Sequence, residues 1–142
     1  MPVKMKAETH SCEETQAAGA RFAATLQGNE IIAFFGDLGA GKTTFLKGMI
    51  SALTGCSPAE ITSPTFNYLH IYEGKFPIYH FDLYRLTAAE QFEGAGFSEY
   101  LQTDGICCLE WAEKIEAKLP AGTIRITIEH QGLDNRLIKI EL

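Results

Sequence analysis

The most apolar stretches of the chain are short, and each indicates a buried strand. Ile31–Phe35 and Gly105–Leu109 are apolar throughout, which is typical of strands that are covered on both faces of a parallel sheet. Other runs are rich in β-branched and aromatic residues or alternate between apolar and polar positions. They predict two strand pairs, Thr65–Tyr72 with Phe76–Tyr84 and Thr123–Glu129 with Arg136–Leu142.

Helix signals lie between these strands. Ser11 and Glu14 form a capping box, which predicts a helix over residues 11–27. Further helical segments are predicted at Thr43–Leu53, Thr87–Phe92, Ser98–Leu101 and Trp111–Leu119. The alternation of strands and helices, without repeat or linker, predicts one α/β domain over residues 1–142. Its central sheet would be mixed, mostly parallel, and flanked by helices.

The amino-acid composition limits the classes of function that fit this chain. The chain has 142 residues, of which 46% are hydrophobic and 21% charged, an ordinary balance for one globular domain. Its formal net charge is −6. This argues against stand-alone binding to nucleic acid, which needs a dense cationic surface. The charge does not exclude a function on nucleic acid within a complex, because a partner could supply the positive charge.

The sequence also predicts a cytoplasmic protein. It has no apolar run of about 20 residues that could span a membrane, and Met1–His10 lacks the apolar core of a signal peptide. The four cysteines include no CxxC pair, which disfavours zinc and thioredoxin chemistry. Reduced thiols are therefore expected. Because Cys107 and Cys108 are adjacent in a strand, they should point to opposite faces of the sheet.

A glycine-rich segment carries the clearest chemistry. Gly36–Thr43 has the spacing GxxxxGK[ST], and it lies between a predicted strand and a predicted helix. Its glycines allow close approach of the backbone, whose N–H groups and the helix N-terminus hold anionic phosphate. Lys42 can reach the β- and γ-phosphates, and the hydroxyl of Thr43 can bind Mg²⁺. The segment predicts a P-loop NTPase.

Such a site needs a carboxylate near the metal, at the end of a neighbouring strand. Glu110 follows the apolar run that ends at Leu109, and Asp82 lies in a second β-rich run. Strand alternation places His80 on the same face as Asp82. Either acid could instead be a solvated charge at the sheet rim, and His80 alone is more typical of a packed strand residue than of a metal ligand.

Four blocks of the sequence together resemble the TsaE family, also called the YjeE family. They appear in the family order, and the resemblance covers essentially the whole chain. The blocks are Gly36–Phe45, Ser63–Phe66, His80–Leu86 and Glu110–Trp111.

The resemblance implies an ATP-binding subunit of bacterial tRNA threonylcarbamoyladenosine synthesis. Its partners, TsaD and TsaB, transfer threonylcarbamoyl from threonylcarbamoyl-AMP to adenosine 37 of tRNA, so that tRNA is contacted only through the complex. The ATPase would support turnover of that complex rather than perform the transfer. We expect a weak, Mg²⁺-dependent ATPase that its partners stimulate.

The resemblance also implies roles for individual residues. Thr43 and Glu110 would bind Mg²⁺, and Asp82 would orient water or metal. Ser63–Phe66 would act as a switch near the γ-phosphate. With Lys42, the two acids would form the catalytic set. The residues expected to bind ATP are Thr15, Gly39, Ala40, Gly41, Lys42, Thr43, Thr44, Trp111 and Arg136.

Two other classes of P-loop protein are less well supported. A small-molecule kinase commonly grips phosphates with several arginines, but this chain has four in all: Arg21, Arg85, Arg125 and Arg136. A regulatory GTPase would carry a guanine-reading NKxD-type segment, and the sequence has none. Trp111, the only tryptophan, is either a core anchor or a neighbour of the nucleotide.

Overall fold

The computed structural model describes residues 3–36, 41–102 and 104–141. Its strands are β1 (Val3–Thr9), β2 (Ile31–Phe35), β3 (Leu69–Tyr72), β4 (Ile78–Asp82), β5 (Ile106–Glu110), β6 (Ile124–His130) and β7 (Arg136–Glu141). Its α-helices are α1 (Cys12–Ala23), α2 (Lys42–Thr54) and α3 (Glu90–Gly94). Three 3₁₀ helices complete the set, η1 (Pro58–Glu60), η2 (Phe97–Leu101) and η3 (Ala112–Lys118).

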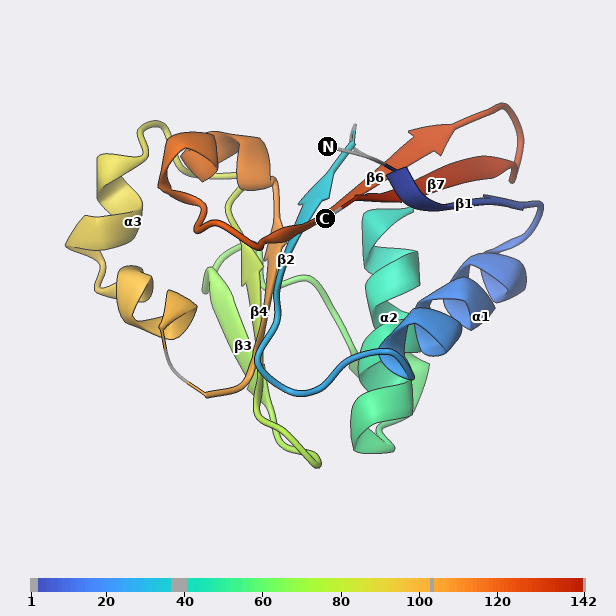
Figure 1. The fold of residues 1–142 in the computed structure, drawn as a ribbon, viewed down its shortest axis with the longest axis horizontal. Helices are drawn as coiled ribbons and strands as arrows, with labels where there is room; N and C mark the ends of the chain where they lie inside the picture. Colours follow the sequence, from blue (N-terminus) through green and yellow to red (C-terminus); the bar gives the residue numbers. More distant parts are fainter. Residues whose placement is uncertain (1–2, 37–40, 103, 142) are drawn as a thin grey trace.

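The described strands form one seven-stranded sheet in the order β1-β7-β6-β2-β5-β4-β3. Its centre is parallel, since β2 pairs with both β6 and β5, and β5 pairs with β4. The outer strands pair antiparallel: β1 with β7, β7 with β6, and β3 with β4. Helices α1 and α2 cover one face, and α3 lies on the other (Figure 1). The predicted α/β class with a mixed, helix-flanked sheet is therefore confirmed.

The two faces of the sheet carry separate apolar cores. Along β2, Ile32 and Phe34 join the core beneath α1 and α2, whereas Ala33 joins the core beneath α3 and η3. The same alternation separates Cys108 from Cys107, which lie in the first and the second core. The prediction that these thiols point to opposite faces is confirmed, and burial raises the pKa of both.

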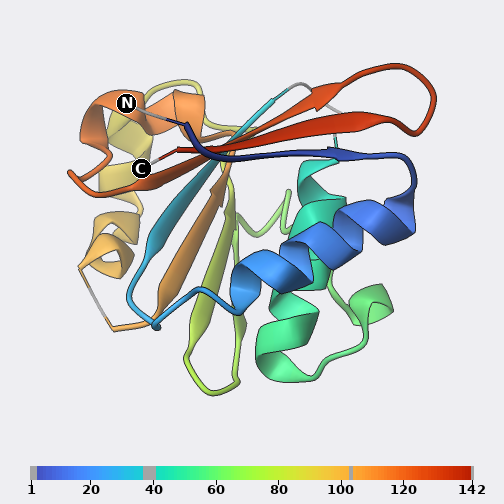
Figure 2. The same cartoon turned by 45° about the vertical axis from the view of Figure 1, so that its right-hand side comes forward.

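Helices α1 and α2 cross each other in contact (Figure 2), and glycines lie where they meet. A Cβ on Gly19 would lie 2.1 Å from the carbonyl oxygen of Phe45, and one on Gly48 would lie 1.9 Å from that of Gln16. Since real Cβ atoms do not approach so closely, this helix crossing requires glycine at both positions. The contact fixes the helix that follows the glycine-rich segment against the rest of the fold.

Several element boundaries differ from those predicted. Strand β1 was missed, although Lys4, Lys6 and Glu8 alternate with less polar residues in the pattern of a charged edge strand. Helix α1 ends at Ala23 rather than residue 27, because the backbone N–H groups of residues 24–26 bond to carbonyls three residues back, in 3₁₀ geometry. The segment after Trp111 is 3₁₀ rather than α-helical. No helix among the described residues is both long and apolar enough to cross a membrane.

Candidate nucleotide and metal site

The glycine-rich segment leads directly into α2. Gly41 precedes the first residue of this helix with φ 107°, a left-handed conformation that favours glycine. No side chain caps the helix N-terminus, and its first turn holds no acidic residue. Backbone N–H groups at such an end favour an anion. Gly39 and Ala40, which were predicted to bind ATP, lie outside the described residues.

The lysine of this segment lies against an aromatic ring. Lys42 is 4% exposed, and its Nζ donates a hydrogen bond to the carbonyl of Gly36 at 2.6 Å. The same Nζ lies 3.8 Å from the ring centroid of Trp111, a cation–π contact. The backbone of Trp111 has a φ of 59°, which is uncommon for a bulky residue. Residues in such conformations are found preferentially at functional sites. The indole therefore borders the phosphate loop rather than lying deep in a core.

The two predicted carboxylates lie side by side at the ends of neighbouring parallel strands. Asp82 ends β4 and Glu110 ends β5, and the two residues are paired in register. Thr43, from the start of α2, donates its hydroxyl to Oε1 of Glu110 at 3.0 Å. The carboxyl ends of parallel strands thus meet the helix N-terminus, as is usual for ligand sites in open α/β sheets.

Ser63 connects the two acids. Its hydroxyl lies 2.5 Å from Oδ2 of Asp82 and 3.0 Å from Oε2 of Glu110. Both carboxylates are buried, with 4% and 3% of their surfaces exposed. One hydroxyl proton cannot serve two anions fully, and buried negative charge is costly without compensation. The arrangement therefore favours a cation at this point.

The remaining contacts hold Asp82 firmly. Oδ2 accepts a hydrogen bond from the hydroxyl of Thr65 at 2.9 Å, and Oδ1 accepts one from the backbone N–H of Tyr84 at 2.9 Å. Asp82 is thereby tied to the segment that contains Ser63, the candidate switch. A movement of that segment would change the surroundings of both acids.

Most of the predicted site residues line one cavity of about 260 Å³. Its lining residues are Gly41, Lys42, Thr43, Thr44, Ser63, Thr65, Asp82, Glu110, Trp111 and Arg136. Arg136 reaches it from the start of β7, with its Nε 3.3 Å from the point where a Cβ of Gly41 would stand. Thr15 lies outside this cavity. It lines a small adjoining hollow with Gly41, Thr44 and Arg136, and its hydroxyl contacts that of Thr9 at 2.7 Å.

A larger cavity, of about 510 Å³, lies elsewhere and lacks comparable chemistry. It is bordered mainly by apolar groups, and Glu30 supplies its carboxylate. That carboxylate already accepts hydrogen bonds from the backbone N–H groups of Gln27, Gly28 and Asn29. We assign the candidate site to the smaller cavity, because it joins the helix N-terminus, the lysine and the acids.

One residue of the site was missed from the sequence. His80 is fully buried, and its Nε2 lies 2.7 Å from Oε2 of Glu110. Its position on the same strand face as Asp82 was the available signal, but the pairing of β4 with β5 decides which acid it meets. No cluster of three or more His, Cys, Asp or Glu side chains suited to a metal occurs among the described residues. A site built from one or two carboxylates and a hydroxyl remains compatible with Mg²⁺, which keeps waters and phosphate oxygens as further ligands.

The chain is similar to known proteins along most of its length. Residues 9–138 match the family model described as threonylcarbamoyl adenosine biosynthesis protein TsaE. Two relatives are named tRNA threonylcarbamoyladenosine biosynthesis protein TsaE. The one from Treponema pallidum is 35% identical, covering 96% of this chain and 99% of its own. The one from Bacillus subtilis is 39% identical, covering 95% and 84%.

A solved structure agrees with these sequence matches. The crystal structure of Bacillus subtilis YdiB superposes with a TM-score of 0.78 and 37% identity, over 99% of this chain and 86% of that one. The family model spans both the glycine-rich segment and the two carboxylates. The chain therefore belongs to the TsaE family of threonylcarbamoyl adenosine biosynthesis proteins.

Proposed function

We propose that this protein binds ATP with Mg²⁺ and hydrolyses it slowly, in support of TsaD-like and TsaB-like partners that modify adenosine 37 of tRNA. The observation that carries the proposal is the convergence of Thr43, Asp82 and Glu110 at the N-terminus of α2. That convergence combines a phosphate-binding helix end with paired oxygen ligands for a hard cation. The same chemistry makes a cytoplasmic location the natural one, where ATP and tRNA are both available.

The phosphate chain of ATP would lie along the glycine-rich segment. Lys42 would exchange its contact with the carbonyl of Gly36 for the β- and γ-phosphates. Trp111 and Arg136 border the same cavity and would flank the nucleotide. Thr15 and Thr44 would contribute at the adjoining hollow, where both line the wall with Gly41.

The donor set fits Mg²⁺. The Thr43 hydroxyl and the Glu110 carboxylate are oxygen ligands held 3.0 Å apart, and Mg²⁺ prefers oxygen. When bound, the ion supplies positive charge to the phosphate oxygens. Thr43 and Glu110 would hold it, and Asp82 would orient water or the ion's hydration shell. Ser63 would then be relieved of serving two carboxylates with one proton.

The partner surface would adjoin the candidate switch. Phe66 is 81% exposed and follows Thr65, whose hydroxyl donates to Asp82. Tyr84 is 44% exposed, and its own backbone N–H donates to Asp82. Arg85 lies over the Phe66 ring, with its guanidinium carbon 5.5 Å from the centroid, and its Nη1 is 3.5 Å from the Phe66 carbonyl. Exposed aromatics beside an arginine are typical of protein contacts. A partner seated here would sense the nucleotide through Ser63 and Thr65.

The ATP assignment is tested by calorimetry. Lys42→Ala should weaken ATP binding by about 10- to 150-fold, since a charge-assisted contact is worth about 1.5–3 kcal/mol. Lys47→Ala is the matched control, because Lys47 lies on the same helix but does not line the cavity. Wild-type affinity in Lys42→Ala would overturn the assignment.

If the protein were a small-molecule kinase, several arginines would be expected around the phosphate site. Of the four arginines, Arg136 lines the cavity, Arg85 lies over Phe66, and Arg125 pairs with Glu116 at 2.9 Å. The fourth, Arg21, lies in the last turn of α1. The four arginines do not form the phosphate-gripping group that a small kinase commonly uses. Hydrolysis of ATP and GTP should be compared with and without nucleoside and sugar acceptors. Phosphate transfer to an acceptor would favour the kinase, whereas release of phosphate to water favours the ATPase.

A further inference from the structure

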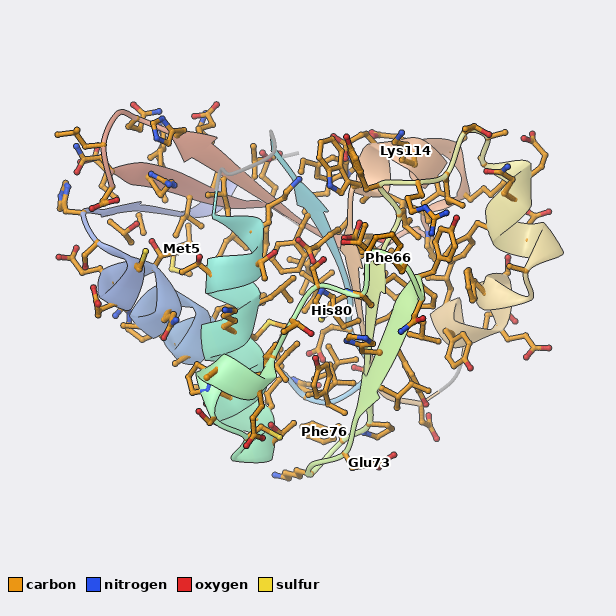
Figure 3. The ribbon with its side chains drawn as sticks, turned by 180° about the vertical axis from the view of Figure 1, so that it is seen from behind. Met5, Phe66, Glu73, Phe76, His80 and Lys114 are labelled. Atoms are coloured by element: carbon orange, nitrogen blue, oxygen red, sulfur yellow. The ribbon has the colours of Figure 1, made fainter. Side chains whose placement is uncertain are left out.

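His80 is a buried polar residue of β4, and its sequence position alone is more typical of strand packing than of metal binding. It has no exposed surface, and in Figure 3 it lies on β4, at a distance from the hairpin turn that carries Glu73 and Phe76. Its Nε2 lies 2.7 Å from Oε2 of Glu110, a hydrogen-bond distance typical of a charged acceptor. A fully buried imidazole in contact with a proposed metal ligand requires an explanation beyond packing.

The surroundings of the two ring nitrogens determine which of them carries the proton. Nδ1 of His80 is buried and has no hydrogen-bond partner among the described residues. If Nδ1 carried the sole ring proton, a buried N–H would lack an acceptor, and the bare Nε2 would face a carboxylate oxygen. Both features are unfavourable. The proton therefore belongs on Nε2, which donates to Glu110.

That donation distinguishes the two oxygens of Glu110. Oε2 accepts from His80 and from Ser63, whereas Oε1 accepts from Thr43. Thr43 is the proposed metal-binding hydroxyl. Because two hydrogen bonds hold Oε2, the carboxylate cannot rotate freely. Its Oε1 therefore stays directed toward the start of α2.

We propose that His80 is a positioning residue that presents Oε1 of Glu110 to the magnesium ion. The proposal rests on the proposed function, because it takes Thr43 and Glu110 as the ligands of that ion. Outer partners of metal ligands commonly change metal affinity by about 10- to 100-fold when removed. A histidine that only fills space would change the stability of the fold without that selective effect on the metal.

Two amide substitutions distinguish these roles. In His80→Gln the amide nitrogen stands near the place of Nε2 and can still donate to Glu110. In His80→Asn it stands near the place of Nδ1 and falls short. Mn²⁺ serves as the probe, and its binding to the ADP-loaded protein is measured by electron paramagnetic resonance. Affinity for ADP without metal and thermal melting are measured alongside.

We expect His80→Asn to bind Mn²⁺ about 10- to 100-fold more weakly than wild type, with its metal-free ADP affinity unchanged. His80→Gln should recover most of the loss. Equal Mn²⁺ affinity in wild type and His80→Asn would overturn the positioning role alone. Failure of the wild type to bind Mn²⁺ with ADP would instead contradict the proposed function.

A measurement on the wild type keeps the proposal testable if His80→Asn does not fold. ¹⁵N NMR of histidine-labelled protein reports which ring nitrogen carries a proton, and the His80 signals are assigned by their loss in His80→Gln. A proton on Nε2 supports the proposal. A proton-free Nε2 would overturn it.

Discussion

The hydroxyl of Thr43 lies 3.0 Å from Oε1 of Glu110, although 67 residues separate them in the chain. The contact arises because β2 and β5 are parallel neighbours and α2 begins shortly after β2 ends. Both residues thus lie at the same edge of the sheet. The proximity of hydroxyl and carboxylate is the geometric basis of the proposed magnesium site.

Glu110→Gln should abolish Mg²⁺-dependent ATP hydrolysis while leaving the fold intact. The amide keeps the shape of the side chain but removes the negative charge that the ion requires. Hydrolysis rates and melting curves check both parts. Asp82→Asn should also be slow, yet it should retain Mn²⁺ binding if, as proposed, Asp82 orients water and does not bind the ion. Full Mg²⁺-dependent activity in Glu110→Gln would indicate that Asp82, rather than Glu110, binds the ion.

Trp111 should report nucleotide binding through its emission. Nζ of Lys42 lies 3.8 Å from the indole centroid, and phosphate would draw that ammonium away from the ring. Because the chain has one tryptophan, the signal has one source. Saturating ATP or ADP should change the emission, and Lys42→Ala should change it even before nucleotide is added. Emission that stays constant in both experiments would argue for a core anchor.

The grouping of the motif residues around one cavity could be predicted, because these residues are local in sequence or lie at strand ends. Gly36–Thr43 marks a strand-to-helix turn by itself, and Glu110 and Asp82 were recognisable as the ends of strands. The contact between His80 and Glu110 was not recognisable, because it depends on the register between β4 and β5. The hydrogen bonds of Ser63 to both acids depend on the path of a loop, which sequence periodicity does not determine.

The edges of the fold were harder to predict than its centre. The apolar strands β2 and β5 are buried on both faces, so composition alone identifies them. Strand β1 carries alternating charges and pairs with β7 near the other end of the sequence, a long-range contact that local pattern cannot supply. The role of each site residue, and the assignment of residues 1–142 to one domain, stay predictions.

Gly48→Ala should destabilise the fold by about 1–3 kcal/mol, the usual cost of overpacking. The added methyl would stand 1.9 Å from the carbonyl oxygen of Gln16, so α1 and α2 would have to separate. Gly94→Ala is the matched control, since a Cβ there meets nothing within 4 Å. Urea unfolding measures both variants. Equal stabilities would contradict the close helix contact.

The free energy of unfolding should fall as the pH rises above about 8.5, the ordinary pKa of a thiol. Burial, with the nearby Cys107 and Glu110, raises the pKa of Cys108 in the folded protein. The unfolded chain therefore loses this proton first, and alkali favours unfolding. One thiol contributes a slope of up to about 1.4 kcal/mol per pH unit. Cys108→Ala should reduce the slope by that amount, as measured by urea unfolding between pH 8 and 10. An unchanged slope would contradict the burial argument.

Hydrolysis by the isolated protein should be slow and should depend on its partners. Arg85 is the one arginine in the four sequence blocks that resemble the TsaE family, and it contacts the ring and carbonyl of Phe66. The cation that neutralises developing charge would then come from a partner. An arginine supplied in this way is worth on the order of 10³–10⁵ in rate in related enzymes.

The partner surface can be separated from catalysis by substitution. Phe66→Ala should weaken stimulation by removing the exposed aromatic side chain at the end of the switch segment. Ile71→Ala, which removes an exposed apolar side chain from β3, should not. Arg85→Ala should also weaken stimulation, because Arg85 lies over the Phe66 ring. Identical stimulation in all variants would exclude this surface.

The most direct test is the initial rate of ATP hydrolysis with purified TsaD-like and TsaB-like proteins added stepwise. We predict a low rate for the protein alone and a large rise when both partners are present. ATP should also bind more tightly to the assembled complex if it strengthens docking, because the coupling is reciprocal. A fast basal rate that no partner alters would contradict the account and return the kinase reading to consideration.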